Sequence, residues 1–264
     1  MNNCCFNCPF DALQLASAEY TGADILLTTD KKVEMTIAIT NNEFRQLLDK
    51  ELSPIMLQYG FKYDGQYTWF GEVINHMRKA ISVYLLKGTA SIFKWQITFD
   101  FIPLPNGNNL AYSRTEKSIK PHLYEYPDDY YKSFHSVESN VWKHSPCKMF
   151  LSGSNIQEIV NNIHQALSCD FNRLQNWHNE FNGLRDALRM VSDKIKPDGI
   201  PIYRFLTPSP VYIKSFILAA LGEKPEGREL LTRYLSDPNW EDALKQKIIK
   251  AFDKVDVSLY QQSS

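Results

Sequence analysis

The side chains that could bind a metal ion gather at two places in the sequence. The first group, near the start of the chain, consists of Cys4, Cys5 and Cys8. The second group lies in a loop-rich stretch and consists of His122, His135, His144 and Cys147. Cys5 and Cys8 have the spacing of half a zinc site, but no second pair follows at finger-like spacing. The later group matches no known ligand spacing. We therefore expect free thiols and solvated or capping histidines.

Nucleophiles and phosphate-binding loops are equally sparse. The serines near His135 and His144 lie in no Gly-x-Ser-x-Gly elbow, and neither GxGxxG nor a P-loop occurs. The sequence therefore contains no complete catalytic motif, and we expect that the chain is not an enzyme.

Composition excludes several classes of partner. The 264 residues include 29 Lys and Arg against 30 Asp and Glu, a formal charge of −1, which gives no attraction to nucleic acid or to an anionic membrane. Apolar runs such as 216–221 are far shorter than the roughly 20 residues that span a bilayer. An odd count of five cysteines favours a reducing compartment over a secreted disulfide framework. We expect a cytoplasmic protein without a membrane partner.

The first 34 residues differ from the rest of the chain. Residues 11–20 have the apolar spacing of a short helix, with Pro9 before it and Gly22 after it. Residues 24–30 then form an apolar strand. This is half of an α/β unit, with Asp11 at the start of the helix and Asp30 at the end of the strand.

These residues resemble the C-terminal end of a PIN domain. The resemblance covers about 30 residues: Pro9 to Ala18 and Gly22 to Lys31. PIN domains are metal-dependent ribonucleases, common as toxins of bacterial toxin–antitoxin pairs. The resemblance implies that Asp11 and Asp30 belong to an acidic cluster that holds Mg²⁺ or Mn²⁺, which agrees with the preference of hard cations for carboxylate oxygens.

The chain departs from the PIN pattern in one respect that matters for activity. The family's first-strand Asp and its mid-domain acid would precede Met1 and are not in the sequence. Two carboxylates alone make a weak Mg²⁺ site. The alternative roles are a helix cap for Asp11 and a surface acid for Asp30.

Residues 35–153 have the pattern of an α+β domain. Asn41 or Asn42 can cap a helix whose apolar stripe runs from Phe44 to Tyr59. Strand signals follow at 66–71, 78–86 and 91–102, and in the last of these apolar residues alternate with polar ones. The pattern predicts a helix packed on one face of an antiparallel meander sheet, with Trp95 on the buried face and Lys94, Gln96 and Thr98 on the other.

The aromatic residues of this strand could have one of two roles, stacking on nucleic-acid bases or packing in the core. Phe93, Lys94 and Trp95 interleave aromatic and basic side chains, which could stack single-stranded bases. The two-residue period of apolar side chains along the strand favours a position in the core for Phe93 and Trp95 instead. Asp128, Asp129, Tyr130 and Tyr131 similarly allow either an acidic and aromatic contact surface or a turn with one buried ring.

Residues 154–258 predict an all-α part. Ser154 is a good N-cap, and stripes of apolar residues at helical spacing recur from Ile156 to Phe252. Pro208 and Pro210 open one of these helices, and Gly222 ends it.

From Met35 to about residue 258 the pattern is similar to a bacterial family known as domain of unknown function 4304. The resemblance rests on Phe44-x-x-Leu47-Leu48, Leu57-x-Tyr59-Gly60-Phe61-Lys62 and Tyr67-x-Trp69-Phe70, with support from 203–208 and 219–222. It implies an α+β core and no catalytic residues. We expect a binding or accessory protein that binds another protein. The alternative is a remnant or part of a PIN-type ribonuclease.

Overall fold

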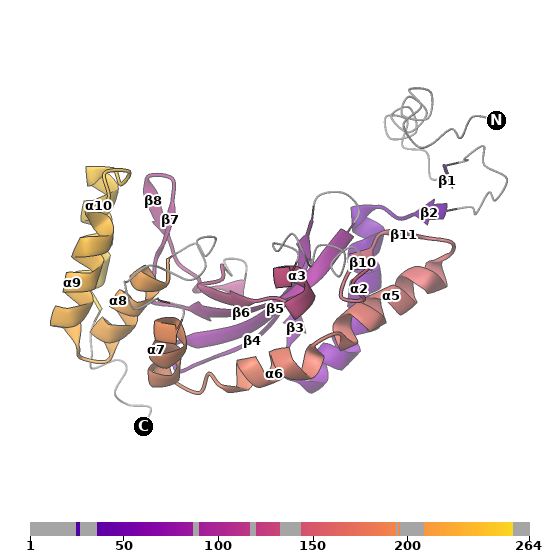
Figure 1. Ribbon diagram of the computed structural model, residues 1–264, viewed down its shortest axis with the longest axis horizontal. Coiled ribbons are helices and arrows are strands. Elements are labelled where there is room, and N and C mark those ends of the chain that lie inside the picture. Colours follow the sequence, from indigo (N-terminus) through magenta and orange to yellow (C-terminus); the bar gives the residue numbers. More distant parts are fainter. Residues whose placement is uncertain are drawn as a thin grey trace.

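The chain has a mixed α+β fold in a computed structural model that describes residues 25–26, 36–86, 90–116, 120–132, 144–193, 195 and 209–255. A central antiparallel sheet is flanked by helices, and the C-terminal part is helical (Figure 1). This confirms the fold class expected for residues 35–258. Neither the PIN-like segment nor the division into domains is tested, because residues 1–24 and 27–35 lie outside the described residues.

Helix α2 (Asn41–Gln58) begins with a reciprocal capping box. The Glu43 amide donates to Thr40 Oγ1 at 3.2 Å, and the Thr40 amide donates to Glu43 Oε2 at 2.7 Å. The predicted cap at Asn41 or Asn42 was one or two residues late, because Thr40 and Glu43 satisfy each other's backbone groups. Phe44, Leu48 and Met56 are fully buried, as the apolar stripe predicts.

The main sheet has the order β10-β6-β5-β4-β3, and β9 also pairs with β6. Its strands are β3 (Lys62–Tyr63), β4 (Thr68–Ile74), β5 (Met77–Leu85), β6 (Ala90–Phe99), β9 (Leu123–Glu125) and β10 (Met149–Phe150). All the pairs are antiparallel, and the longest is β5 with β6, from Met77 opposite Phe99 to Leu85 opposite Ser91. The meander predicted from the alternating strand is confirmed.

One face of this sheet is apolar and packs against α2, α5 (Ile156–Ser168) and α6 (Phe171–Asn179), which lie along the same side in Figure 1. Trp95 is 1% exposed, and its ring centroid lies 5.4 Å from that of Phe171 and 4.8 Å from that of His178. The position of Trp95 in the core is the predicted one, and it leaves this ring no surface on which a base could stack.

The opposite face differs from the exposed polar face that the alternation predicts. Gln96 and Thr98 are only 3% and 1% exposed. The Gln96 amide donates to the Ser82 hydroxyl, and the Thr98 hydroxyl donates to the Arg78 carbonyl at 3.4 Å. Period-two alternation reports only which side chains share a face. Buried polar side chains remain compatible with it because they bond to one another.

The loop-rich stretch after β6 contains several short elements. They are the hairpin β7 (Leu104–Asn106) and β8 (Asn109–Ala111), the helix α3 (Asp128–Lys132), and β11 (Ser152–Gly153). β11 pairs with β2 (Thr36–Ala38), and β2 pairs with β1 (Ile25–Leu26), which makes a second, three-stranded sheet. Elements this short give too few residues for a periodic signal.

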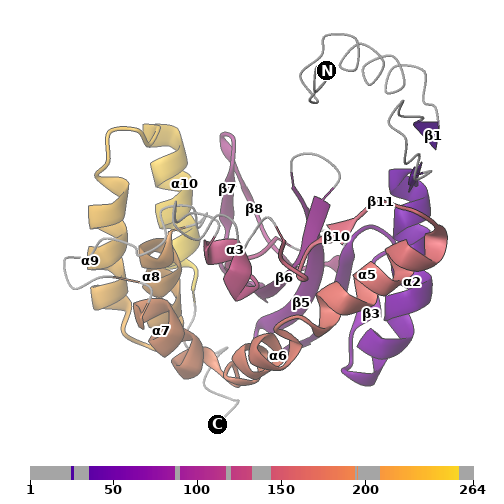
Figure 2. The ribbon, with the colours of Figure 1, turned by 45° about the vertical axis from the view of Figure 1, so that its right-hand side comes forward.

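The C-terminal helices α7 (Leu184–Asp193), α8 (Pro210–Ala220), α9 (Lys224–Leu235) and α10 (Asp242–Asp253) form a group at the end of the sheet away from α2 (Figure 2). Ser209 caps α8 with Pro210 in its first turn, and Gly222 follows it at φ 93°. Within the described residues, no helix is long and apolar enough to cross a membrane.

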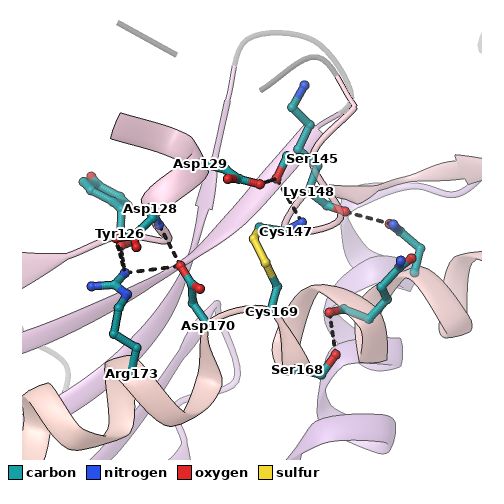
Figure 3. Close-up of a disulfide and its surroundings, with 12 residues drawn as sticks. Tyr126, Asp128, Asp129, Ser145, Cys147, Lys148, Ser168, Cys169, Asp170 and Arg173 are labelled. Carbon is teal, nitrogen blue, oxygen red and sulfur yellow. Dashed lines mark hydrogen bonds and ion pairs between the residues drawn. A yellow bond between two sulfur atoms is a disulfide. The ribbon is translucent and has the colours of Figure 1, made fainter. Parts of the chain in front are cut away.

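Cys147 and Cys169 form a disulfide that joins the residue two before β10 to the end of α5 (Figure 3). Their Cα atoms are 5.2 Å apart and their separation in sequence is 22 residues. The expectation of free thiols was therefore wrong for this pair, because the antiparallel pairing of β10 with β6 brings Cys147 back beside α5. The predicted cytoplasmic location stays a prediction.

Candidate functional site

The carboxylates of the PIN-like segment, Asp11 and Asp30, lie outside the described residues, as do Cys4, Cys5, Cys8 and His135. The predicted Mg²⁺ or Mn²⁺ site is therefore untested. Across the ranges described above, no group of three or more His, Cys, Asp or Glu side chains could hold a metal ion.

His122 has a structural role. The Phe99 amide donates to His122 Nδ1 at 3.0 Å, and His122 Nε2 donates to the Ile102 carbonyl at 2.9 Å. The ring is fully buried, and burial lowers its pKa to about 4. Both nitrogens are thus engaged by the backbone, and the ring could bind a metal only by giving up one of these bonds.

A cleft of about 730 Å³ lies beside the outer edge of β4. Its wall comes from residues in the segments 57–62, 70–79 and 175–182, together with Ile97 and Glu116. These are the end of α2 with β3, the β4–β5 hairpin and the end of α6. We call it the β4 cleft, and it is of a size that binds ligands in other proteins.

Three cations and two acids line the β4 cleft: Lys62, Arg78, Lys79, Glu72 and Glu116. None of the five forms an ion pair or a side-chain hydrogen bond with a residue in the described part of the chain. Burial lowers the pKa of Lys79, and in the described part of the chain no carboxylate stabilises its charged form. The cleft therefore presents cations whose charge the protein itself does not compensate.

Arg78 is the most incompletely satisfied of these cations. Its Nε and Nη1 atoms are buried, and neither donates to a described residue. Its guanidinium carbon lies 5.6 Å from the centroid of the Phe70 ring, which provides only a cation–π contact. Gln175 Oε1, which α6 contributes to the lining, is also buried and accepts from no described residue. Such groups are costly to bury unpaired, so they are typical of sites that a ligand completes.

The rim of the β4 cleft is apolar. Leu57 is 62% exposed and Ile74 is 65% exposed, and Tyr59 and Val73 are also exposed. β3 pairs with β4 only at Trp69 and Phe70, so within the described residues no strand pairs with the outer side of 71–74. Exposed apolar groups around a partly unpaired strand end are typical of surfaces that bind a partner.

Sequence reasoning missed the β4 cleft. One signal was available: Arg78 and Lys79 stand side by side in a strand whose next residues are apolar. Two adjacent residues of a strand point to opposite faces, so a charged pair there places a cation on the core face. Nothing in the sequence indicated that Gln175 lines the cleft, because α6 and β4 are distant in the chain.

Comparison of the chain with models of protein families, with curated proteins and with solved structures finds no match.

Proposed function

We propose that the protein is a non-enzymatic binding protein, and that the β4 cleft receives an acidic, partly apolar segment of a protein partner. The observation that carries this proposal is the Arg78 guanidinium, which has two buried nitrogens that find no acceptor among the described residues. A carboxylate is the group that matches a guanidinium fork, with two parallel hydrogen bonds.

The apolar rim supports a peptide segment over a small anion. Leu57, Val73 and Ile74 are exposed around the cations, so a ligand that also buries apolar surface gains from both. A segment with alternating acidic and apolar residues in extended form presents these groups on its two faces. Because three cations and two acids nearly balance in the β4 cleft, the attraction between the cleft and an acidic segment acts through direct contacts and not over a long range.

The test uses a fluorescently labelled peptide that alternates glutamate with leucine over eight residues. Its binding to the full chain is measured by anisotropy, and a peptide that alternates lysine with leucine serves as the control. We expect the acidic peptide to bind and the basic one not to bind. Arg78→Met should weaken binding by a factor of at least about 10, since it removes a desolvated charge pair.

Lys50→Met is the matched variant, because Lys50 lies on α2 outside the cleft, 78% exposed and 3.2 Å from Glu51. It should leave the affinity within about twofold, since exposed pairs contribute little. Arg78→Met should also not lower the free energy of unfolding, because it removes an unpaired buried charge. Equal affinity of Arg78→Met and the unaltered protein would contradict the proposal.

The resemblance to the bacterial family 4304 is compatible with this proposal, since it brings no catalytic residues. The PIN alternative stays a prediction, because Asp11 and Asp30 are not among the described residues. RNA incubated with the protein and Mn²⁺ should remain intact, since two carboxylates alone make a weak metal site. Cleavage that needs the metal and is lost in Asp30→Ala would establish the alternative.

A further inference from the structure

A second site lies on the central strand of the sheet, on the face away from α2, α5 and α6. Lys94 extends there from β6, and its Nζ atom is 5.4 Å from the ring centroid of Tyr84 and 5.5 Å from that of Tyr124. Tyr84 is on β5 and Tyr124 is on β9, the strands on either side of β6. The amine is therefore held between two phenol rings by the register of three paired strands.

A third ring completes the wall. Tyr126 lies with its centroid 5.8 Å from that of Tyr84 and 5.4 Å from that of Tyr124, and Tyr130 of α3 lies 4.5 Å from Tyr126. We call Lys94 with Tyr84, Tyr124 and Tyr126 the tyrosine-walled lysine site. Lys94 is half-buried and Tyr84 is 40% exposed, so the site is open to solvent.

Lys94 forms no hydrogen bond or ion pair with any residue that the structure describes. Buried lysines are usually paired. Lys224, which is also half-buried, donates to the carbonyls of Asp253 and Val255, at 2.8 and 3.1 Å. The titratable side chains that contact Lys94 from β5 and β9 are the phenols of Tyr84 and Tyr124, and Ser82 lies opposite Lys94 on β5. Burial raises the pKa of Tyr124 to about 12, so its hydroxyl stays neutral. Burial without an opposing carboxylate lowers the pKa of Lys94 to about 8.

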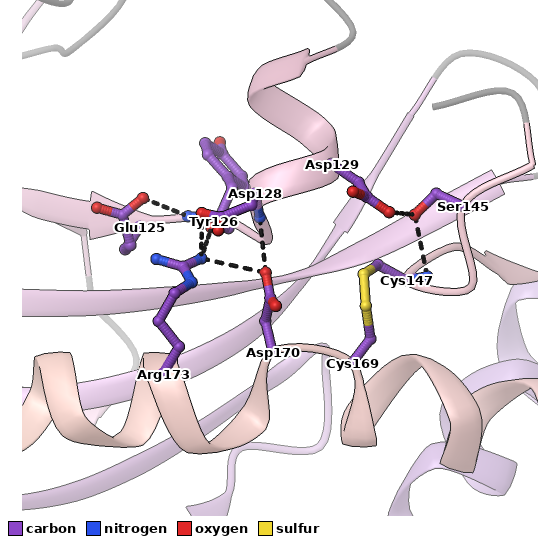
Figure 4. Close-up of polar contacts among 9 residues, drawn as sticks. All are labelled: Glu125, Tyr126, Asp128, Asp129, Ser145, Cys147, Cys169, Asp170 and Arg173. Carbon is purple, nitrogen blue, oxygen red and sulfur yellow. Dashed lines mark hydrogen bonds and ion pairs between the residues drawn. A yellow bond between two sulfur atoms is a disulfide. The ribbon is translucent and has the colours of Figure 1, made fainter. Parts of the chain in front are cut away.

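Hydrogen bonds near the disulfide hold the tyrosine rings of this site in position. The Asp128 amide donates to Asp170 Oδ2 at 2.7 Å, and Arg173 Nη2 donates to the Tyr126 carbonyl at 2.6 Å (Figure 4). Ser145, beside the disulfide, donates from Oγ to Asp129 Oδ2 at 2.8 Å. α3 and Tyr126 are thus tied to α6 and to the disulfide, which preorganises the rings around the amine.

We propose that Lys94 is a nucleophilic amine that captures a small aldehyde as a Schiff base within the tyrosine-walled lysine site. The lone pair of the neutral amine forms the bond to the carbonyl carbon, and the carbonyl π electrons move to oxygen. The oxygen takes up both protons that the nitrogen carried, the C–O bond breaks as the nitrogen lone pair forms the C=N bond, and the oxygen leaves as water, so that amine and aldehyde give imine and water. No oxidant or reductant takes part, and the site does not depend on the β4 cleft.

The test measures the reactivity of each lysine in the full chain. The protein is incubated with acetaldehyde and cyanoborohydride, which traps the imine as an ethylamine, and the adducts are quantified by peptide mass spectrometry from pH 6 to pH 10. Lys50, with a side chain 78% exposed, is the internal reference. At pH 8 we expect Lys94 to react at least about 10 times faster, because burial lowers its pKa and so favours the neutral, nucleophilic amine.

Tyr124→Ala opens the wall to water, which stabilises the ammonium form. We expect the rate at Lys94 to fall about fivefold at pH 8 while the rate at Lys50 stays unchanged. Lys94→Arg should remove the fast adduct altogether. The comparison of Lys94 with Lys50 in the unaltered protein needs no variant, so it decides the matter even if Tyr124→Ala does not fold. A Lys94 that reacts no faster than Lys50 at pH 8 would overturn the proposal.

Discussion

Two histidines, His122 and His178, are buried, and each bonds to the backbone around β6. His122 bridges the Phe99 amide and the Ile102 carbonyl, and His178 donates from Nε2 to the Gln96 carbonyl at 3.1 Å. Burial lowers the pKa of His122 to about 4 and that of His178 to about 3. In the unfolded chain both rings would titrate near 6.5.

This difference predicts how stability depends on pH. Between about pH 6.5 and 4 the unfolded chain takes up protons that the folded protein does not, so the free energy of unfolding falls as the pH falls. Each histidine contributes a slope of up to about 1.4 kcal/mol per pH unit, and above pH 6.5 the effect vanishes. Urea unfolding at pH 7.5, 6 and 5 measures the slope.

His122→Gln should flatten this slope between pH 6 and 5. His164→Gln is the matched variant, since His164 is 41% exposed and pairs with Glu51 at 3.2 Å. It should leave the slope nearly unchanged. A slope that His122→Gln does not alter would mean that His122 is already protonated in the folded protein.

Trp95 should be among the residues that stability depends on most. Its ring is 1% exposed and contacts Phe171 and His178. Trp95→Ala leaves a large cavity, and we expect a loss of about 3–5 kcal/mol in the free energy of unfolding. Phe150→Ala, at a ring that is 38% exposed, should cost less than about 1 kcal/mol. Similar losses in the two variants would place Trp95 outside the core.

At the scale of the element, α8 and α9 approach closely at Gly227. A Cβ atom on Gly227 would stand 2.5 Å from the Ser215 carbonyl oxygen, which is a backbone atom and cannot rotate away. Gly227→Ala should therefore destabilise the protein by about 1–3 kcal/mol, despite the higher helix propensity of alanine. Gly183→Ala, where a Cβ meets nothing within 4 Å, is the control. Thermal unfolding of both variants measures the difference. An equal stability of the two variants would mean that α8 and α9 can move apart at Gly227 without a loss in the free energy of unfolding.

The elements with strong periodicity could be predicted from sequence. α2 and β6 each contain several repeats of their apolar pattern, and both lie within a few residues of the predicted bounds. The short strands β7 to β11 could not be predicted, because two or three residues contain no period. The burial of Gln96 was also beyond the pattern, since it depends on a hydrogen bond to another strand.

The candidate sites escaped prediction for the same physical reason. Arg78 and Gln175 both line the β4 cleft from segments almost 100 residues apart, and Tyr84 and Tyr124 meet at Lys94 from different strands. Such proximity follows from tertiary packing and not from local spacing. The alternation placed Lys94 on the correct face, but nothing in it indicated that tyrosines would surround the amine.

For the whole molecule, we predict that residues 1–34 are dispensable for the fold of the rest of the chain. β1 joins the described structure through two residue pairs with β2, while β2 is held on its other side by β11. A chain that begins at Met35 should fold with a melting temperature within a few degrees of the full chain, since so short a pairing contributes little. Aggregation of this shorter chain, or a much lower melting temperature, would make the N-terminal segment an integral part of the fold.

The disulfide also limits how far the molecule can be stretched. It closes a ring across the 22-residue separation between Cys147 and Cys169, so α5 lies inside a covalent loop while both ends of the chain lie outside it. Under tension applied at the termini, force passes through the sulfur bridge and α5 bears none of it. The extended length of the unfolded chain is then shorter by about 70 Å, at roughly 3.3–3.6 Å per residue, and a reductant restores this length. Single-molecule pulling would therefore register the oxidation state of this pair as a change in contour length.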